Sequence, residues 1–462
     1  MAVQMNYFAP NGWIPPNPDE DYVLVQYKLQ LTTGIAEDKF SDACATVAAE
    51  SSTGTWTKVE ANEDSGIIKA EEYKAVVYDV DTKNHLFKVA YKTDLFELGN
   101  MSGFLAGPVG NVGGMKMVRG LRILDIRFPR RLVESFPGPR FGIDGVRDLL
   151  EQNTMQRQMP IIGTVPKPKV GRTAQEMAIL AWRLWTTGDG TFDFIKDDEN
   201  LTSLVFNTVE ERIKKVLKIQ KDAEKKAGHK KLYLCNITHS DIDIMLERAK
   251  LIKKSGGVCM MMDVVTTGFA AVHTMRRKNP GLIIHAHRAM HAFFTRESGS
   301  GVSGIGEIEG FSISMIVLAK LLRLLGVDSL HSGTPKGKME DYGEAQEVMH
   351  MLTSTLTKPN PQFHTLGQNW YNIKRVWPVA SGGLHPGVMD KVIETMGSDC
   401  FVQLGGGVLG HPEGAERGAE AALEARSAAY KKITVTQYAK THPDSALAKA
   451  ISYWGTEPKV VY

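Results

Sequence analysis

The sequence has few cysteines and no pattern that would join them. Its four cysteines are far apart, and none belongs to a C-x-x-C pair. They are Cys44, Cys235, Cys259 and Cys400. This spacing suggests neither a disulfide framework nor a cysteine-based zinc cage. The cysteine usage predicts a protein of a reducing compartment.

Long apolar runs are also missing. No segment approaches the roughly 18 consecutive apolar residues of a membrane span. The first residues, MAVQMNYFAPNGW, lack a basic stretch followed by an apolar core. We therefore expect a cytoplasmic protein with no membrane partner.

The chain carries little net charge. Its 462 residues have a formal net charge of +3, which is too small to predict a nucleic-acid partner. The basic run at residues 225–231 ends a polar helical pattern and is predicted to be a solvated face. With 43% hydrophobic and 23% charged residues, the composition is that of a globular enzyme.

The first 140 or so residues mix two kinds of pattern. Alternating segments such as DYVLVQYKLQ and AVVYDVD indicate strands, and the segments between them indicate helices. The proline-spaced RFPRRL and ESFPGPRF then indicate a linker. We predict an N-terminal α+β domain over residues 1–140 and a second domain over residues 141–462.

The second domain has a regular rhythm. Short apolar runs rich in β-branched residues alternate with amphipathic helical stretches, two of which open with capping-box spacing at 173–176 and 208–211. The apolar runs are PIIGTV, FDFIKD, LYLCNIT, VCMMMDVV, LIIHAHR, SLHSGT, VWPVASGG and CFVQLGGG. Eight such units in about 300 residues predict a (β/α)8 barrel, whose strands are covered on both faces.

Reactive and glycine-rich residues cluster where these predicted strands end. The first strand is followed by Lys167 and Lys169, and later strands by KDDE, HAHRAMH, HSGTPKGK, SGG and GGG. Active sites of such barrels lie at the carboxyl ends of the strands. The positions therefore predict one catalytic site at that edge of the barrel.

The segment KDDE has two interpretations. Lys196 and Asp198 point to the same side of a strand, and Glu199 can turn in beside them. The group is then either a buried ion pair or a site for a hard cation such as Mg²⁺, which takes oxygen ligands. A protonated lysine would repel the cation. A neutral lysine that adds CO₂ becomes an anionic carbamate and would give a third oxygen donor.

The segment HAHRAMH places His285 and His287 on one face of a strand, with Arg288 at its end. Zinc binding is the rival interpretation. We favour a histidine acting on substrate and a forked arginine donor for phosphate, with His285 a structural hydrogen-bonding residue. The glycines of SGG and GGG predict a phosphate site after the last two strands, or else only tight turns.

Taken together, several motifs carry a specific resemblance. They are GTVPKPK, FDFIKDDEN, HAHRAMHAFFTR, HSGTPKGKME, PVASGGLHPG and QLGGGVLGHPEG, in this order, with AAESSTGTW at 48–56 and VGNVGG at 109–114. This set resembles the large subunit of ribulose-1,5-bisphosphate carboxylase/oxygenase (RuBisCO), over nearly the whole chain. The likeness is closer to archaeal-type members (form III or II/III) than to plant-type ones.

The resemblance implies a metal site and four catalytic residues. Lys196 matches the lysine carbamylated by an activator CO₂, with Asp198 and Glu199 as the other Mg²⁺ ligands. Its carbamate removes the C3 proton of ribulose 1,5-bisphosphate, which gives an enediolate. The other catalytic positions are Lys167, which protonates the final carbanion, His287 near the C3 oxygen, and Lys338 on a closing loop. The implied reaction gives two 3-phosphoglycerates, with O₂ competing with CO₂.

The resemblance also implies the substrate contacts. One phosphate end matches Arg288, His331 and Ser381, and the other matches Gly383, Gly405 and Gly406 with Lys338, while Lys169 lies behind Lys167. In the N-terminal domain, Glu50, Thr55, Trp56 and Asn111 match residues that complete the neighbouring subunit's site. A homodimer or a higher assembly of dimers is therefore expected, without a small subunit.

Two other functions stay open at this stage. A RuBisCO-like enolase or isomerase would form the enediolate without fixing carbon, and a silent barrel would only bind. Retention of Lys167, Lys196, His287 and Lys338 argues against both. Departures from the usual pattern include Val165 and Pro166 just before Lys167, and a glycine-rich segment at 296–310 that suggests a loop or an oligomer contact.

Overall fold

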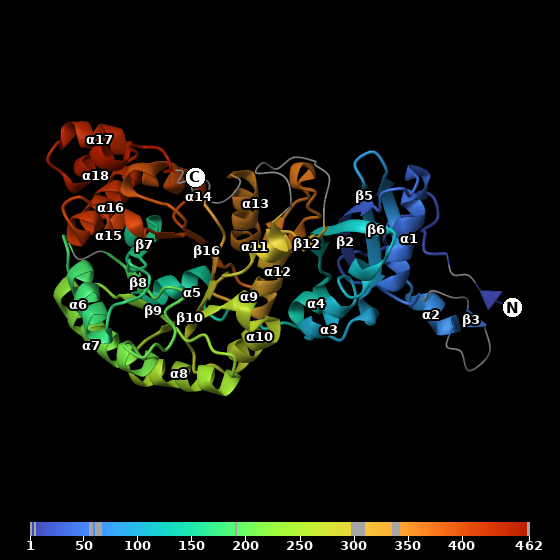
Figure 1. The fold of residues 1–462 in the computed structure, drawn as a ribbon, viewed down its shortest axis with the longest axis horizontal. Helices are drawn as coiled ribbons and strands as arrows, with labels where there is room; N and C mark the ends of the chain where they lie inside the picture. Colours follow the sequence, from blue (N-terminus) through green and yellow to red (C-terminus); the bar gives the residue numbers. More distant parts are fainter. Residues whose placement is uncertain are drawn as a thin grey trace. The chain divides into compact units, whose positions relative to one another are not determined.

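The computed structural model describes residues 2–3, 6–54, 59–60, 67–189, 192–296, 310–334 and 342–459. The chain forms two compact units (Figure 1). The first contains Met1–Pro137, Met290–Leu324 and Ser354–Ile373. The second contains Gly138–Ala289, Leu325–Thr353 and Lys374–Tyr462.

The first unit is built on a five-stranded sheet in the order β12-β6-β2-β5-β4. Its long strands are β2 (Tyr22–Leu31), β4 (Val76–Asp81), β5 (Leu86–Lys92) and β6 (Val118–Arg127). These pair antiparallel, whereas the short β12 (Gly310–Ile313) lies parallel to β6. The pairing of β12 brings a segment from the second half of the chain into this unit. The predicted N-terminal α+β architecture is confirmed.

Helices and short strand pairs complete the first unit. The helices are α1 (Phe40–Glu50), α2 (Ile67–Tyr73), α3 (Met101–Ala106), α4 (Arg130–Glu134), α11 (Ala292–Thr295) and α12 (Met315–Leu325). The pairs are β1 (Ala2–Val3) with β3 (Val59–Glu60), and β14 (Leu356–Thr357) with β15 (Gln368–Asn369). Asn100 caps α3 by accepting a hydrogen bond from the Gly103 N–H at 2.9 Å.

The second unit is a closed barrel of eight parallel strands, as the apolar runs predicted. In chain order the strands are β7 (Ile161–Thr164), β8 (Phe194–Lys196), β9 (Leu232–Asn236), β10 (Cys259–Asp263), β11 (Ile283–His287), β13 (Ser329–His331), β16 (Trp377–Ala380) and β17 (Phe401–Gln403). Each pairs with its neighbours in parallel, and β17 pairs with β7 to close the ring. The predicted TIM barrel is confirmed.

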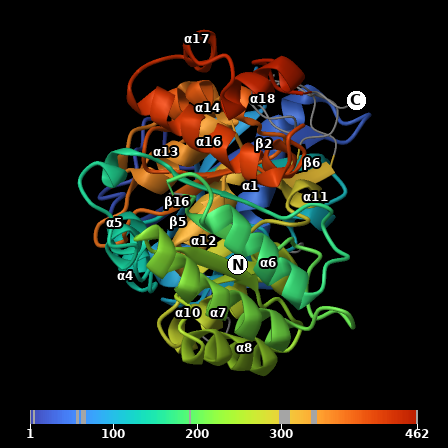
Figure 2. The ribbon, with the colours of Figure 1, turned by 90° about the vertical axis from the view of Figure 1, so that its left-hand side faces the viewer.

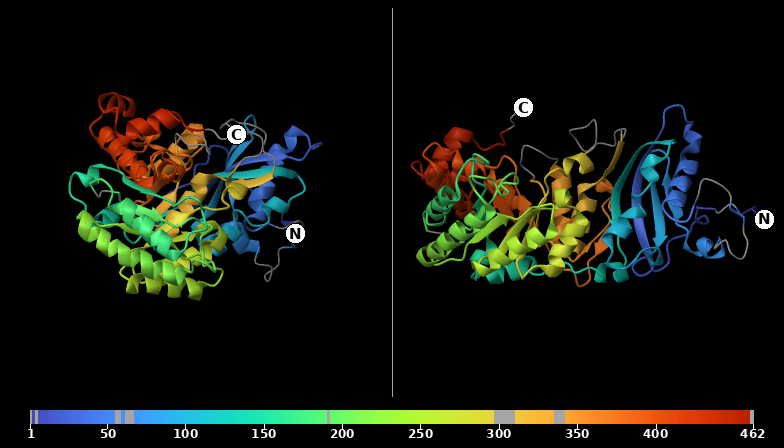
Figure 3. Two further views of the ribbon diagram at one scale, coloured as in Figure 1. Left: turned by 60° about the vertical axis from the view of Figure 1, so that its left-hand side comes forward. Right: turned by 60° about the horizontal axis from the view of Figure 1, so that its bottom comes forward.

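Helices surround the barrel strands. After β7 to β10 come α6 (Ala174–Trp185), α7 (Val209–Ala227), α8 (Ile242–Lys254), α9 (Val264–Thr267) and α10 (Phe269–Lys278). Figure 2 shows α6, α7 and α8 side by side on the outer face. Further along the chain lie α13 (Tyr342–Thr353) and α14 (Met389–Met396). The last helices, α15 (Gly406–Leu409), α16 (Ala415–Tyr430), α17 (Val435–Thr441) and α18 (Ala446–Trp454), gather in one group, red in Figure 3.

Local sequence fixes where two of these helices begin. Thr173 and Glu176 form a reciprocal capping box at the start of α6, in which Thr173 Oγ1 accepts from the Glu176 N–H and Glu176 Oε2 accepts from the Thr173 N–H. Thr208 accepts from the Glu211 N–H at the start of α7. These bonds satisfy amide groups that a helix N-terminus leaves without partners. Both predicted helix starts are confirmed.

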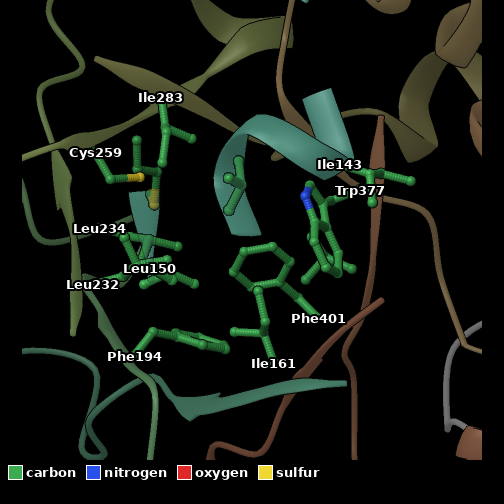
Figure 4. Packing of buried hydrophobic residues seen from close by; sticks show 13 residues of the cluster. Ile143, Leu150, Ile161, Phe194, Leu232, Leu234, Cys259, Ile283, Trp377 and Phe401 are labelled. Carbon is green, nitrogen blue, oxygen red and sulfur yellow. The ribbon is translucent and has the colours of Figure 1, made fainter. Parts of the chain in front are cut away.

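The amino ends of the barrel strands form an apolar core (Figure 4). The first residues of seven strands belong to it, among them Ile161, Phe194 and Phe401. Helix α5 (Gly142–Leu149) adds Ile143 and Val146 to the same cluster. This end is filled largely by apolar side chains, and active sites of such barrels lie at the opposite, carboxyl end of the strands.

Three further predictions can be compared with the structure. All four cysteines are free and buried, as their spacing predicted. No helix within the described ranges is both long and apolar enough to cross a membrane. The prediction of a solvated basic run is wrong for Lys231, which is only 1% exposed and donates from Nζ to the Phe192 carbonyl oxygen at 2.9 Å. Lys231 directly precedes the barrel strand β9, and its side chain is therefore buried.

Candidate active site

The carboxyl ends of the barrel strands bring together the residues that the sequence singled out there. Lys196 ends β8, His287 ends β11 and His331 ends β13. Lys167 and Lys169 follow β7, Asp198 and Glu199 follow β8, Arg288 follows β11, Ser381 and Gly383 follow β16, and Gly405 and Gly406 follow β17. Parallel strands of one barrel deliver all of these to the same edge.

Lys196 ends β8 at this edge and is fully buried. Its Nζ donates a hydrogen bond to the Asp197 carbonyl oxygen at 2.7 Å. Burial lowers the pKa of the Lys196 amine below its ordinary value, although the charges of Glu199 and Asp198 oppose this. A lowered pKa makes the neutral, nucleophilic amine available at a lower pH than in a lysine at the surface.

Each of the two carboxylates beside Lys196 forms an ion pair with another lysine. Lys167 Nζ lies 2.8 Å from Asp198 Oδ2, and Lys169 Nζ lies 2.9 Å from Glu199 Oε1. Burial alone would raise the pKa of Glu199, yet the charges of His287 and Lys196 help to lower it to about 2. Both lysines thus neutralise carboxylate oxygens that could otherwise bind a metal cation.

These carboxylates supply too few ligands on their own. Among the described residues, no group of three His, Cys, Asp or Glu side chains is arranged to hold a metal ion. Hard cations such as Mg²⁺ prefer oxygen donors in octahedral geometry. Asp198 and Glu199 offer such oxygens, and a carbamate on Lys196 would add the missing one. The donor set therefore fits Mg²⁺ once Lys196 has reacted with CO₂.

His287 is oriented by a residue that sequence reasoning missed. Its Nδ1 lies 2.9 Å from Asp263 Oδ1, and its Nε2 lies 3.6 Å from Glu199 Oε2. The Ala289 N–H also lies 3.2 Å from Nδ1. If Nδ1 carries the proton and donates it to Asp263, Nε2 is free to take one. Asp263 ends β10, and an acid closing the apolar run VCMMMD was a signal that could have been used.

The side chains of His285 and His331 form a chain of hydrogen bonds that ends at Ser381. His285 Nδ1 lies 2.8 Å from Ser329 Oγ, and His285 Nε2 lies 3.1 Å from His331 Nε2. His331 Nδ1 lies 2.8 Å from Ser381 Oγ. His285 thus has the structural hydrogen-bonding position predicted for it, while His331 and Ser381 lie at the rim with Arg288, which is 8% exposed.

Two of the glycines after the last two strands are favoured by their conformation or surroundings. Gly383 has a φ of +78°, which side chains with a Cβ rarely adopt. A Cβ at Gly405 would lie 3.1 Å from Lys167 Cε and 3.2 Å from Val165 Cγ1. The absence of a side chain at 405 therefore leaves room for Lys167 to reach Asp198.

Comparison with known proteins agrees with this geometry. The family model of the ribulose bisphosphate carboxylase large chain, catalytic domain, matches residues 142–454, and that of its N-terminal domain matches residues 15–132. The chain belongs to the RuBisCO large-chain family.

The similar proteins are archaeal RuBisCOs. The ribulose bisphosphate carboxylase of Thermococcus kodakarensis is 41% identical over 461 residues, covering 97% of each chain. That of Methanocaldococcus jannaschii is 41% identical over 413 residues, covering 88% of this chain and 92% of the relative. Dimeric archaeal Rubisco from Hyperthermus butylicus superimposes with a TM-score of 0.84 at 39% identity, covering 96% of this chain and 97% of the other. The predicted archaeal-type large subunit is confirmed.

Other predicted RuBisCO residues belong to the first unit or lie outside the described residues. Glu50 ends α1 and Asn111 precedes a short 3-10 helix (Val112–Gly114), both in the first unit. Thr55, Trp56 and Lys338 lie outside the described residues, as do residues 297–309 of the glycine-rich segment. The structure thus brings together the barrel residues, and the roles of all the predicted site residues stay predictions.

The buried histidines should make stability depend on pH. Burial lowers the pKa of both His285 and His331 well below the ordinary histidine value. Below about pH 6.5 the unfolded chain then binds more protons than the folded one, so the free energy of unfolding falls as the pH falls. Each histidine should contribute a slope of about 1.4 kcal/mol per pH unit.

Urea unfolding at pH 7.5, 6 and 5 measures this slope. The variant His285→Gln should show a slope that is shallower by about 1.4 kcal/mol per unit between pH 6 and 5, because one titrating group is gone. An unchanged slope in a folded variant would contradict the prediction.

Proposed function

We propose that this chain carboxylates D-ribulose 1,5-bisphosphate, using CO₂ and water to form two molecules of 3-phosphoglycerate, with O₂ competing for the same enediolate. The observation that carries the proposal is the buried Lys196 beside Asp198 and Glu199, with Lys167 and His287 in contact with those two carboxylates. The family and its named relatives support the activity.

Lys196, Asp198 and Glu199 would hold Mg²⁺. The Lys196 ammonium would lose one proton to give the neutral amine, which would add an activator CO₂ and lose a second proton, so that a cation is replaced by an anionic pair of oxygens. The ammonium groups of Lys167 and Lys169, which neutralise the two carboxylates, would then be free for substrate. When bound, Mg²⁺ supplies the positive charge that makes the C3 proton of the substrate more acidic and stabilises negative charge on oxygen.

Three side chains move protons in this proposal. The carbamate oxygen of Lys196 takes the C3 proton of the bisphosphate. His287, with Nδ1 held by Asp263, uses Nε2 for the proton of the C3 oxygen during hydration. Lys167 Nζ, 32% exposed and directed at Asp198, delivers the last proton to the carbanion at C2. Each transfer needs its donor within hydrogen-bond reach of the reacting atom.

The two phosphate groups would lie at opposite sides of this centre. Arg288, His331 and Ser381 are proposed to bind one of them, because a guanidinium fork and a hydroxyl donate to phosphate oxygens. Backbone N–H groups of Gly383, Gly405 and Gly406, together with Lys338, are proposed to bind the other. Lys338 also steadies the incoming carboxylate as its loop closes.

The assembly is inferred from the relatives. Solved relatives include the dimeric enzyme of Hyperthermus butylicus and an octameric one from Pyrococcus horikoshii. We infer a homodimer or an assembly of dimers without small subunits, in the cytoplasm. Glu50, Thr55, Trp56 and Asn111 of one subunit would complete the site of its neighbour.

The deciding experiment is fixation of labelled CO₂. Purified protein is incubated with bicarbonate and Mg²⁺, ribulose 1,5-bisphosphate is added, and labelled 3-phosphoglycerate is measured. Product is expected. Mg²⁺-dependent binding of the bisphosphate without product would contradict carboxylation and support a non-carboxylating enolase or isomerase.

Metal removal provides a further prediction. Treatment with EDTA should abolish carboxylation, and addition of Mg²⁺ with bicarbonate should restore it, because the C3 proton is not acidic enough without the cation. Mg²⁺ without CO₂ or bicarbonate should restore little activity, since Lys196 would remain an amine. Full activity after complete chelation, verified by metal analysis, would rule out this mechanism.

A further inference from the structure

The first of the three acids that follow Lys196 has a different environment from the other two. Successive side chains of a strand point to opposite faces, so Asp197 points away from the face of Lys196 and Asp198. Its carboxylate is fully buried. It accepts hydrogen bonds from Arg212 Nε at 2.9 Å, from Tyr233 OH at 2.8 Å and from the Asn236 N–H at 3.0 Å. These partners come from α7 and β9, the elements that follow in the chain.

Arg212 ties this carboxylate to the segment that follows the metal ligands. The arginine is fully buried and donates to the carbonyl oxygens of Leu201 and Thr202, each at 3.2 Å. It also donates to Asn207 at the carbonyl oxygen (3.0 Å) and at Oδ1 (2.9 Å). Burial alone would lower the pKa of Arg212, but the Asp197 charge raises it above its ordinary value. Arg212 therefore keeps its positive charge in this buried position.

Two further contacts connect the same partners to the catalytic loops. Asn236 Nδ2 donates to the carbonyl oxygens of Asp198 and Glu199 at 3.3 and 3.2 Å. Asn207 Nδ2 donates to the Arg172 carbonyl oxygen at 2.7 Å, and the Arg172 guanidinium donates to the Lys167 carbonyl oxygen at 2.7 Å. The cluster thus holds the backbone on both sides of the candidate metal site.

We propose that Asp197, Arg212 and Tyr233, here named the Asp197 clamp, are positioning residues that hold Asp198 and Glu199 in the geometry that binds Mg²⁺. Two carboxylates on adjacent residues repel each other, and an unrestrained turn would let them separate. Partners that orient metal ligands usually change metal affinity about 10- to 100-fold when they are removed. The inference rests on the metal site of the proposed function and explains why an acid that does not face the metal stands between Lys196 and Asp198.

The test is a titration of the full-length protein with Mg²⁺ in saturating bicarbonate, in which calorimetry measures the Mg²⁺ affinity. Asp197→Asn should weaken Mg²⁺ binding by about 10- to 100-fold. Tyr233→Phe removes one of three donors and should weaken it less, on the order of threefold to tenfold. Because Asp197→Asn leaves Arg212 buried without a counter-charge and is more disruptive to folding, Tyr233→Phe decides the outcome if Asp197→Asn does not fold.

Matched control variants separate positioning from general stability. Asp328 and Arg276 form another buried ion pair, with Arg276 Nη1 2.9 Å from Asp328 Oδ2. The Asp328 side chain is 0% exposed and the Arg276 side chain is 3% exposed. Asp328 precedes β13 at the amino end of the barrel strands. Tyr27 in the first unit is fully buried, with its hydroxyl 2.8 Å from that of Tyr91. Asp328→Asn and Tyr27→Phe should lower the melting temperature and bind Mg²⁺ as the unmodified chain does.

These measurements distinguish a failure of the clamp proposal from a failure of the carboxylase proposal. Unchanged Mg²⁺ affinity in folded Tyr233→Phe and Asp197→Asn would overturn the clamp, even if the unmodified chain fixes CO₂. Equal weakening in the Asp328→Asn control would also overturn it. Weakened Mg²⁺ binding limited to the clamp variants supports it, even if the unmodified chain forms no 3-phosphoglycerate and the carboxylase proposal fails.

Discussion

Replacement of Lys196 by arginine should reduce carboxylation by at least about 10³-fold, which corresponds to about 4 kcal/mol in the barrier. Arginine keeps the positive charge and most of the side-chain volume. It cannot form the carbamate, because the guanidinium stays protonated in proteins. The change therefore removes an oxygen donor for Mg²⁺ and the base for the C3 proton, and leaves a cation where another cation must bind.

Labelled product formation measures this loss, and trapping of labelled activator CO₂ measures its cause. The variant should retain no trapped CO₂ per subunit. A matched control is Lys231→Arg, because Lys231 is also buried, at 1% exposure, and its pKa is lowered to about 8 by burial. Lys231 precedes β9 at the amino end of the strands, so its replacement should cost stability and preserve most carboxylation in the folded protein. Comparable loss in both variants, or activity of Lys196→Arg above a tenth of the unmodified rate, would contradict the proposed role.

The barrel was predictable because its signal is local. Strands covered on both faces read as continuous apolar runs, so segments such as LYLCNIT and VCMMMDVV mark strands without knowledge of their partners. The reactive residues at their ends follow from the barrel geometry, since parallel strands share one carboxyl edge. For this reason Lys196, His287 and His331 could be placed together from sequence.

The remaining features depend on partners that are distant in sequence. Strand β12 is four residues long and is stabilised by pairing with β6, which no local pattern announces. Asp197 and Asp198 are identical side chains in adjacent positions, and they differ because Arg212 and Tyr233 stand on one side of the strand only. Lys231 belongs to a basic run by sequence but to the barrel wall by tertiary position. Such differences arise from tertiary packing, so they cannot be predicted from the neighbouring residues in one sequence.

Replacement of Lys167 by methionine should separate the first and last proton transfers. In the proposed mechanism Lys196 takes the C3 proton, whereas Lys167 protonates the final carbanion. The variant should lose carboxylation by about 10² to 10⁴-fold, the usual contribution of a positioned acid or base. Exchange of the C3 proton of ribulose 1,5-bisphosphate with solvent should continue, since Lys196, Asp198 and Glu199 are unchanged.

Loss of tritium from C3-labelled bisphosphate measures the first step, and labelled 3-phosphoglycerate measures the whole reaction. Lys88→Met is the matched control, because Lys88 also pairs with a carboxylate, 2.7 Å from Asp79 Oδ2, and its side chain is also 32% exposed, yet it belongs to β5 of the first unit. It should change carboxylation by less than about tenfold, as expected for a screened surface pair. If Lys167→Met stopped both exchange and carboxylation while Mg²⁺ still bound, Lys167 would be needed for the first proton transfer as well. Asp198, which Lys167 contacts at 2.8 Å, would then link the two lysines in one step, and the order of proton transfers proposed here would be wrong.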